Sequence, residues 1–124
     1  MRAFTQSQNG FTVRFRNGLG LSVRWSPFHY CEARKRMDER KADSRRLSLA
    51  VDSHNAEVAL MSPDGEVCGE PLGWVSPEFL TTMFVRVRDF ALPSGLTDFT
   101  PDALELFSEE LKEEWEECLE WKLI

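Results

Sequence analysis

The chain has 124 residues, of which 42% are hydrophobic, and a formal net charge of −6. This length fits a single domain, residues 1–124, and this hydrophobic fraction is enough for a packed core, which excludes a chain disordered throughout. No apolar run approaches the ~20 residues of a membrane-spanning helix, and residues 1–10 lack the apolar core of a signal peptide. We therefore expect a cytoplasmic protein without membrane contact.

The cysteines and the distribution of charge narrow the class further. Cys31, Cys68 and Cys118 are odd in number and scattered, so we expect reduced thiols, and no Cys/His cluster has the spacing of a zinc site. Residues 1–46 hold eleven Lys or Arg against four Asp or Glu, whereas residues 47–124 hold four against seventeen. This asymmetry predicts two faces of opposite sign, or association of copies through them.

The first predicted element is a β-hairpin. Apolar and polar residues alternate over 11–16 and again over 21–25, as in half-buried strands. The intervening NGLG at 17–20 is typical of a tight turn, because Asn and Gly tolerate a positive φ. The polar face of this hairpin would present Arg14, Arg16 and Arg24.

A loop at 26–31 and a charged stretch follow the hairpin. Residues 32–46, EARKRMDERKADSRR, predict a basic surface loop or a short solvated helix. Their cations could contact phosphates while Phe28 and Tyr30 stack on bases, but the acidic chain as a whole argues against direct nucleic-acid binding. His29 and Cys31 are close enough in sequence for a thiolate–imidazole pair. No third orienting residue is evident, so we assign no catalytic residue.

A second hairpin and two helices complete the expected fold. In this second hairpin, the strand pattern of the first strand is strongest at 57–61, and SPDG at 62–65 is a turn. The second strand, from Glu66 toward Trp74, is interrupted by glycine and proline. Ser76-Pro77-Glu78 and Thr100-Pro101-Asp102 are helix start signals. The predicted class is α+β, an antiparallel sheet of three or four strands with two helices packed on one face.

Both helices carry an apolar stripe at three- and four-residue spacing, which predicts one buried side for each. The stripe of the first helix consists of Leu80, Met83, Phe84, Val87 and Phe90. The stripe of the last helix consists of Leu104, Phe107, Leu111, Trp115, Cys118 and Leu119.

The acidic last helix, over 98–124, is the strongest functional signal. Residues 98–122 hold ten Asp or Glu against two Lys. A four-residue step along a helix rises ~6 Å, which is comparable to the spacing of backbone phosphates, and the repulsion of roughly 0.2–0.5 kcal/mol per pair is not relieved within the helix. A solvated helix that only confers solubility is one interpretation, and a dock for a basic groove is the other. The candidate partner-binding residues are Glu105, Leu106, Glu109, Glu113, Glu116, Glu120 and Trp121, where the two apolar residues lie inside the acidic arc as possible anchors.

Three segments follow a recognisable pattern: NGLGLSVRWSPFHYC at 17–31, AEVALMSPDGE at 56–66 and GWVSPEFLTTMFVRV at 73–87. They resemble a family of small uncharacterised proteins of bacteria, phages and prophages, which carry an NG-x-x-V-x-V-x-W-x-P-x-x-Y-C hairpin, an AEVA…DG hairpin and a helix opening with G-[YW]-x-[ST]-P-E. The resemblance covers about residues 10–92, the sheet and the first helix, and implies no catalytic residue. The matching positions are Asn17, Gly18, Trp25, Pro27, Tyr30, Cys31, Ala56, Glu57, Asp64, Gly65, Pro77 and Glu78. The basic stretch and the acidic helix depart from the family pattern.

These features predict a non-enzymatic accessory protein of phage or prophage type. It would inhibit a nucleic-acid-handling defence complex of the bacterial host, in an anti-CRISPR-like or anti-restriction-like manner, with the acidic helix mimicking nucleic acid. The partner would be a basic host protein or nucleoprotein complex in the bacterial cytoplasm. The alternative is a homo-oligomeric structural or interaction protein, such as a homodimer, whose basic and acidic halves pair between copies. We expect no cofactor and no metal.

Overall fold

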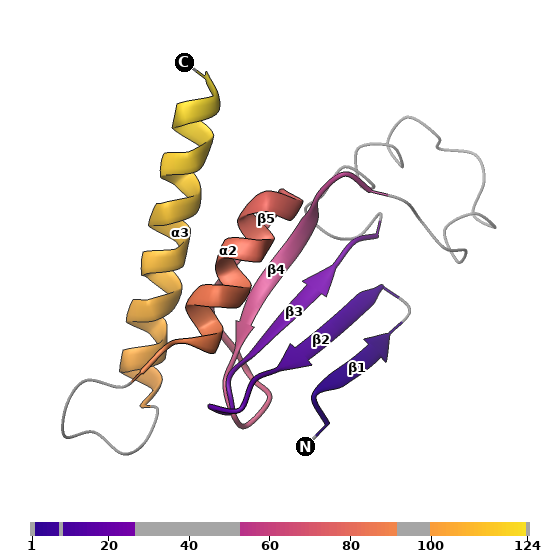
Figure 1. Ribbon diagram of the computed structural model, residues 1–124. Coiled ribbons are helices and arrows are strands. Elements are labelled where there is room, and N and C mark those ends of the chain that lie inside the picture. The colour runs from indigo at the N-terminus through magenta and orange to yellow at the C-terminus, as the bar shows by residue number, and fades with distance from the viewer. Residues whose placement is uncertain (1, 8, 27–52, 92–99, 124) are drawn as a thin grey trace.

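The computed structural model describes residues 2–7, 9–26, 53–91 and 100–123, and for residues 120–123 the backbone alone. A five-stranded antiparallel sheet, in the order β1-β2-β3-β4-β5, carries two helices (Figure 1). The elements are β1 (Phe4–Ser7), β2 (Gly10–Arg14), β3 (Gly20–Arg24), β4 (Ala56–Met61), β5 (Val67–Val75), α2 (Pro77–Arg88) and α3 (Pro101–Leu123). The α+β class is confirmed, but the expected three or four strands were too few. The predicted loop at 27–31, with His29 and Cys31, and the basic stretch 32–46 lie outside the described residues.

The strand that the sequence pattern missed is β1. Its sequence FTQS has a single apolar residue, so no alternation marks it. It joins the sheet through backbone pairing with β2, in a register that runs unbroken from Phe4↔Val13 to Ser7↔Gly10. Backbone hydrogen bonds form with any non-proline residue, and such a strand is therefore invisible to hydrophobic periodicity.

Both predicted hairpins are present. In the first, the amide of Phe15 donates to the carbonyl of Leu19 at 2.8 Å, and Gly18 adopts φ +92° at the turn. In the second, the amide of Ser62 donates to the carbonyl of Glu66 at 2.8 Å around Gly65, whose φ is +85°. Glycine is favoured at both turns because a positive φ costs it little.

One face of the sheet holds the core, and α2 and α3 cover that face side by side (Figure 1). The apolar residues of the strands that fill it are Leu19, Leu21, Val23, Ala56, Val58, Leu60, Leu72 and Val75. The stripe predicted for α2 needs a correction, because Phe79, which was left out of it, is buried with Met83 and Val87, while Leu80 and Phe84 are half-buried. Phe79 packs on Trp115 of α3, with ring centroids 4.9 Å apart, so the buried side of α2 includes the residue that contacts α3.

Asn17 ties the first hairpin turn to the end of α2. Its side-chain amide donates to the carbonyl of Val87 at 2.8 Å and lies 3.4 Å from the carbonyls of Arg88 and Phe90, while its Oδ1 accepts from the amide of Leu19 at 3.0 Å. The last carbonyls of a helix have no partner within the helix. Asn17 satisfies them from outside and fixes α2 against the sheet.

We predict that Asn17→Ala lowers the free energy of unfolding by about 1–3 kcal/mol, because part-buried carbonyls lose one of their donors. Urea denaturation followed by circular dichroism measures the change. Asn9→Ala is the matched control: Asn9 also lies next to a strand, its side chain is exposed, and we expect a change within about 0.5 kcal/mol. Equal losses in the two variants would contradict the role given to Asn17.

Candidate functional site

The acidic helix α3 begins as the sequence predicts. The hydroxyl of Thr100 accepts from the amide of Ala103 at 3.2 Å. Asp102 lies in the first turn, where its negative charge interacts favourably with the positive end of the helix dipole. The first part of the predicted apolar stripe is buried against the sheet and α2. Its buried residues are Leu104, Phe107, Leu111 and Trp115.

The end of that stripe does not reach the core. Cys118 is exposed and Leu119 is 40% exposed, so the prediction that they would be buried was wrong. The last buried residue of the stripe is Trp115, and the helix continues past it to Leu123 (Figure 1). The spacing of the apolar residues indicates a face of the helix, but it does not indicate how far the sheet extends beneath it.

β5 is irregular at two places along its contact with α3. The register against β4 shifts between Val58 and Leu60 and again between Ala56 and Val58, so β5 has extra residues at both places. At the second shift Trp74 has φ +54° and the carbonyl of Gly73 accepts from Nε1 of Trp115 at 3.2 Å. Extra residues of this kind bend a strand and redirect its groups, and here they give the buried indole of α3 its hydrogen-bond partner.

The first irregularity brings the backbone of β5 against α3. Gly69 has φ +68°, and a Cβ placed on it would clash with the side chain of Ser108, which is buried. Next to it, Glu70 accepts from Nζ of Lys112 at 2.8 Å. This hydrogen bond and the charge of its partner lower the pKa of Glu70 and raise the pKa of Lys112.

A second cation neutralises the side of α3 that faces α2. Arg86 lies 3.1 Å from a carboxylate oxygen of Glu114 and 3.6 Å from one of Glu110, and its guanidinium is 5.8 Å from the centre of the Phe107 ring. Arg86 therefore spans two successive turns of the acidic helix. The sequence alone did not indicate this bridge, because Arg86 lies on another element.

Within the described residues, the carboxylates on the solvent side of α3 form no ion pair of this kind. Glu105, Glu109, Glu113 and Glu116 are exposed, and no cation of the described residues forms an ion pair with any of them. Leu106 lies among them and is 63% exposed. We call Glu105, Leu106, Glu109, Glu113 and Glu116 the outer face of α3. For Glu120 and Trp121 the structure describes the backbone of α3 alone.

The charged residues of α3 fall into two groups: those in ion pairs with α2 or β5, and the exposed carboxylates of the outer face. Lys112 lies at one border of the outer face, where the charges of Glu109 and Glu116 also raise its pKa, after the larger effect of Glu70. Arg86 lies at the other border, on Glu110 and Glu114. The negative potential of α3 is thus concentrated on the outer face, where a ligand can reach it.

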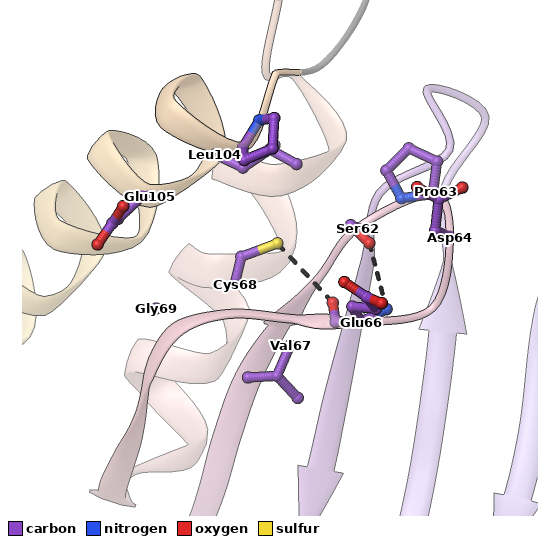
Figure 2. A pocket seen from close by; sticks show the side chains of 10 residues that line it. Ser62, Pro63, Asp64, Glu66, Val67, Cys68, Gly69, Leu104 and Glu105 are labelled. Carbon is purple, nitrogen blue, oxygen red and sulfur yellow. Dashed lines mark hydrogen bonds between the residues drawn. The ribbon is translucent and has the colours of Figure 1, made fainter.

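A cavity of about 560 Å³ adjoins the outer face at the beginning of α3. Figure 2 shows it between the β4–β5 turn and the first turns of α3. Its lining combines apolar and acidic side chains without a cation: Ser62, Pro63, Asp64, Glu66, Val67, Cys68, Gly69, Pro101, Leu104 and Glu105. Because Glu105 belongs both to this lining and to the outer face, a ligand on the outer face can extend into the cavity.

The basic side of the first hairpin is partly used within the sheet. Nη1 of Arg14 donates to the carbonyls of Gly18 and Ser62, each at 3.0 Å. Arg24 donates to Oγ of Ser7 at 2.8 Å and to Oγ1 of Thr12 at 3.2 Å. These two arginines, expected on a basic surface, thus hold neighbouring strands and turns together.

Comparison of the chain with protein-family models, curated proteins and solved structures gave no significant match. Across the described segments, no helix is long and apolar enough to cross a membrane. Nor does any group of three or more His, Cys, Asp or Glu side chains in the described part of the chain form an arrangement that could hold a metal ion.

We predict that Gly69→Ala destabilises the protein more than Gly65→Ala. Both positions have a positive φ, so both variants carry a backbone cost of about 1–2 kcal/mol. Only Gly69 also meets Ser108, whereas at Gly65 the nearest atom is an arginine nitrogen at 3.6 Å, and the added clash should cost about 1–3 kcal/mol more. Thermal and urea unfolding of the two variants measure the difference, and equal losses would show that β5 and α3 are not in close contact.

We also predict that the thiol of Cys68 reacts slowly with alkylating reagents. Burial and the charge of Glu66 raise its pKa, so the reactive thiolate is scarce at neutral pH. Iodoacetamide labelling with peptide mapping should find Cys68 modified more slowly than the exposed Cys118, with a rate that rises as the pH increases above the usual thiol range. Glu66→Gln should speed the labelling of Cys68, and a Cys68 that reacts as fast as Cys118 would contradict this assignment.

Proposed function

We propose that this protein binds a basic groove of another protein through the outer face of α3 and thereby competes with nucleic acid for that groove. The observation that carries the proposal is the separation of charge on α3. Arg86 and Lys112 bind carboxylates at the two borders, while the carboxylates between them remain exposed and unpaired with any described cation. A helix selected only for solubility has no need of this separation.

The geometry of the outer face fits a groove made for a phosphate backbone. Glu105, Glu109 and Glu113 follow one another at four-residue steps, each a rise of about 6 Å, so they form a row of negative charge along one side of a rigid rod. A groove lined with Lys and Arg gains from such a row what it gains from phosphates, together with the release of bound counterions. The bound partner would also relieve the repulsion between these carboxylates.

Leu106 supplies the apolar contact that a charged row lacks. It is 63% exposed and surrounded by carboxylates, an arrangement in which a central apolar side chain is desolvated while charged residues form the rim. The neighbouring cavity, with its apolar floor at Leu104 and its carboxylates, suits the aliphatic stem and cationic head of a lysine or arginine of the partner. The phosphate backbone of nucleic acid offers no apolar contact of this kind. Leu106 and the cavity would therefore favour binding to a protein partner through contacts that nucleic acid does not make.

The resemblance to a family of small proteins found in bacteria, phages and prophages suggests which partner to test first. A CRISPR or restriction complex of a bacterial host has a basic groove for nucleic acid, and a non-enzymatic inhibitor needs only to occupy it. The alternative, pairing of the basic and acidic halves of two copies, has less support in the described residues. Arg14 and Arg24, two cations of the basic half, bond within the sheet.

We predict that Glu109→Gln with Glu113→Gln weakens partner binding by at least about tenfold, because each carboxylate lost removes a complementary charge. The matched control is Ala3→Lys with Asn9→Lys, which changes the net charge equally but at exposed positions close to β1 in the sequence. The strand β1 lies at the sheet edge opposite α3 (Figure 1). Tagged wild-type protein and both variants would be used to capture proteins from a bacterial lysate, with identification by mass spectrometry.

Three results together would support the proposal. The captured protein is retained by the wild type and the control, is lost with the Gln double variant, and is released by an excess of duplex DNA or RNA. Leu106→Ala should also weaken capture while leaving its salt dependence unchanged, because that contact is apolar. Capture that survives the Gln substitutions, or that nucleic acid does not displace, would reject the competition mechanism.

A further inference from the structure

One edge of the sheet is open for pairing within the described residues. β1 is the outermost strand and pairs only with β2. Its inward groups are identified by the hydrogen bond from the amide of Arg14 to the carbonyl of Ala3 at 2.7 Å. Because inward and outward groups alternate along an antiparallel strand, the backbone groups of Thr5 and Ser7 also face β2. Those of Phe4 and Gln6 point away from the sheet.

The apolar layer of the sheet reaches this edge uncovered. Phe4 is paired with Val13, which is paired with Leu21, so these side chains lie on the face that carries the helices. Leu21 is fully buried, whereas Phe4 is 76% exposed, the largest exposure among the large hydrophobic residues described. An aromatic side chain next to a row of free amides and carbonyls is a typical template for an added strand.

The opposite edge shows the protection that β1 lacks. β5 contains Pro71, which has no amide hydrogen, and irregularities with positive φ at Gly69 and Trp74. It is also covered by α3, through Lys112 and Trp115. Such prolines, bulges and covering elements are the usual means of keeping sheet edges from pairing. β1 has an unbroken register and neither a proline nor a charged residue.

We propose that β1 pairs antiparallel with β1 of a second copy of this chain, so that two sheets join across a two-fold axis. In the register that places Phe4 opposite Gln6 of the second copy, every outward amide of these residues meets an outward carbonyl. Thr5 then lies opposite Thr5 on the other face, a favourable cross-strand pair. The two phenylalanines become diagonal neighbours on the helix-bearing face and cover each other.

A second copy is the occupant that this edge fits. Residues 4–7 carry no charge, so two copies meet without repulsion, and the register keeps the two Arg2 side chains at opposite ends of the paired strands. Self-pairing of this kind is isologous and closes after two copies. Because β1 has only four residues, the interface is small, and we expect a weak dimer. The dimer does not depend on the function proposed for α3, since β1 and α3 lie at opposite edges of the sheet (Figure 1).

Sedimentation velocity from low micromolar to millimolar protein tests the proposal directly. The wild type should convert from monomer to dimer over this range, with little dependence on salt because the paired strands are uncharged. Gln6→Pro removes an outward amide without touching the ladder to β2, and Phe4→Lys places a charge at the edge. Each should weaken the dimer by at least about tenfold. Amide hydrogen exchange should show protection of Phe4 and Gln6 that increases with protein concentration.

Leu106→Lys is the matched control for Phe4→Lys, because it exchanges another exposed apolar residue for the same charge on α3. It should leave the dimer intact, as should the Glu109→Gln, Glu113→Gln variant. A wild type that stays monomeric to millimolar concentration would overturn the proposal. This holds even if the edge is then found to pair with a strand of another protein. A dimer that survives both β1 variants, or that salt or the α3 variants abolish, would show that the copies meet elsewhere.

Discussion

The contact between the irregular strand β5 and α3 is the constraint on which the rest of the molecule depends. An isolated helix gains little stability from its own hydrogen bonds and needs tertiary packing of one side, and the crowded carboxylates of α3 work against it. That packing requires a glycine at position 69, where α3 approaches the strand backbone, and a carbonyl at Gly73 turned toward Trp115. A regular β5 would leave the indole of Trp115 without its hydrogen-bond acceptor and would not allow α3 to pack closely on the strand.

The ion pairs of α3 matter more for where the charge lies than for stability. Arg86 and Lys112 are both substantially exposed, and pairs of this kind contribute about 0–1 kcal/mol. Their positions at the two borders of the helix nevertheless decide which carboxylates remain available. The β5 irregularity that brings Glu70 beside Lys112 thus shapes the surface as well as the packing. The fold and the charge pattern have the same structural origin.

Sequence reasoning predicted the features that depend on local patterns. The two hairpin turns, the helix starts at Ser76 and Thr100 and the exposure of the glutamates follow from residue type and spacing. What it missed depends on partners distant in the chain. The strand β1 exists through backbone pairing, the buried Phe79 of α2 packs on Trp115 of α3, and the bridge from Arg86 joins two helices. The glycines and the proline within β5 were seen as interruptions, and their true meaning, a bulged strand under a helix, needed the position of α3.

The side chain of Asn17 has a kinetic consequence. It bonds to a carbonyl 70 residues further along the chain, and that bond can form only once α2 lies against the first hairpin. Contacts between such distant segments generally form late, after the entropy of closing the intervening chain has been lost. An interaction absent from the transition state affects the rate of unfolding rather than the rate of folding. We infer that Asn17 acts as a latch: it prolongs the lifetime of the native state while contributing little to how fast that state is reached.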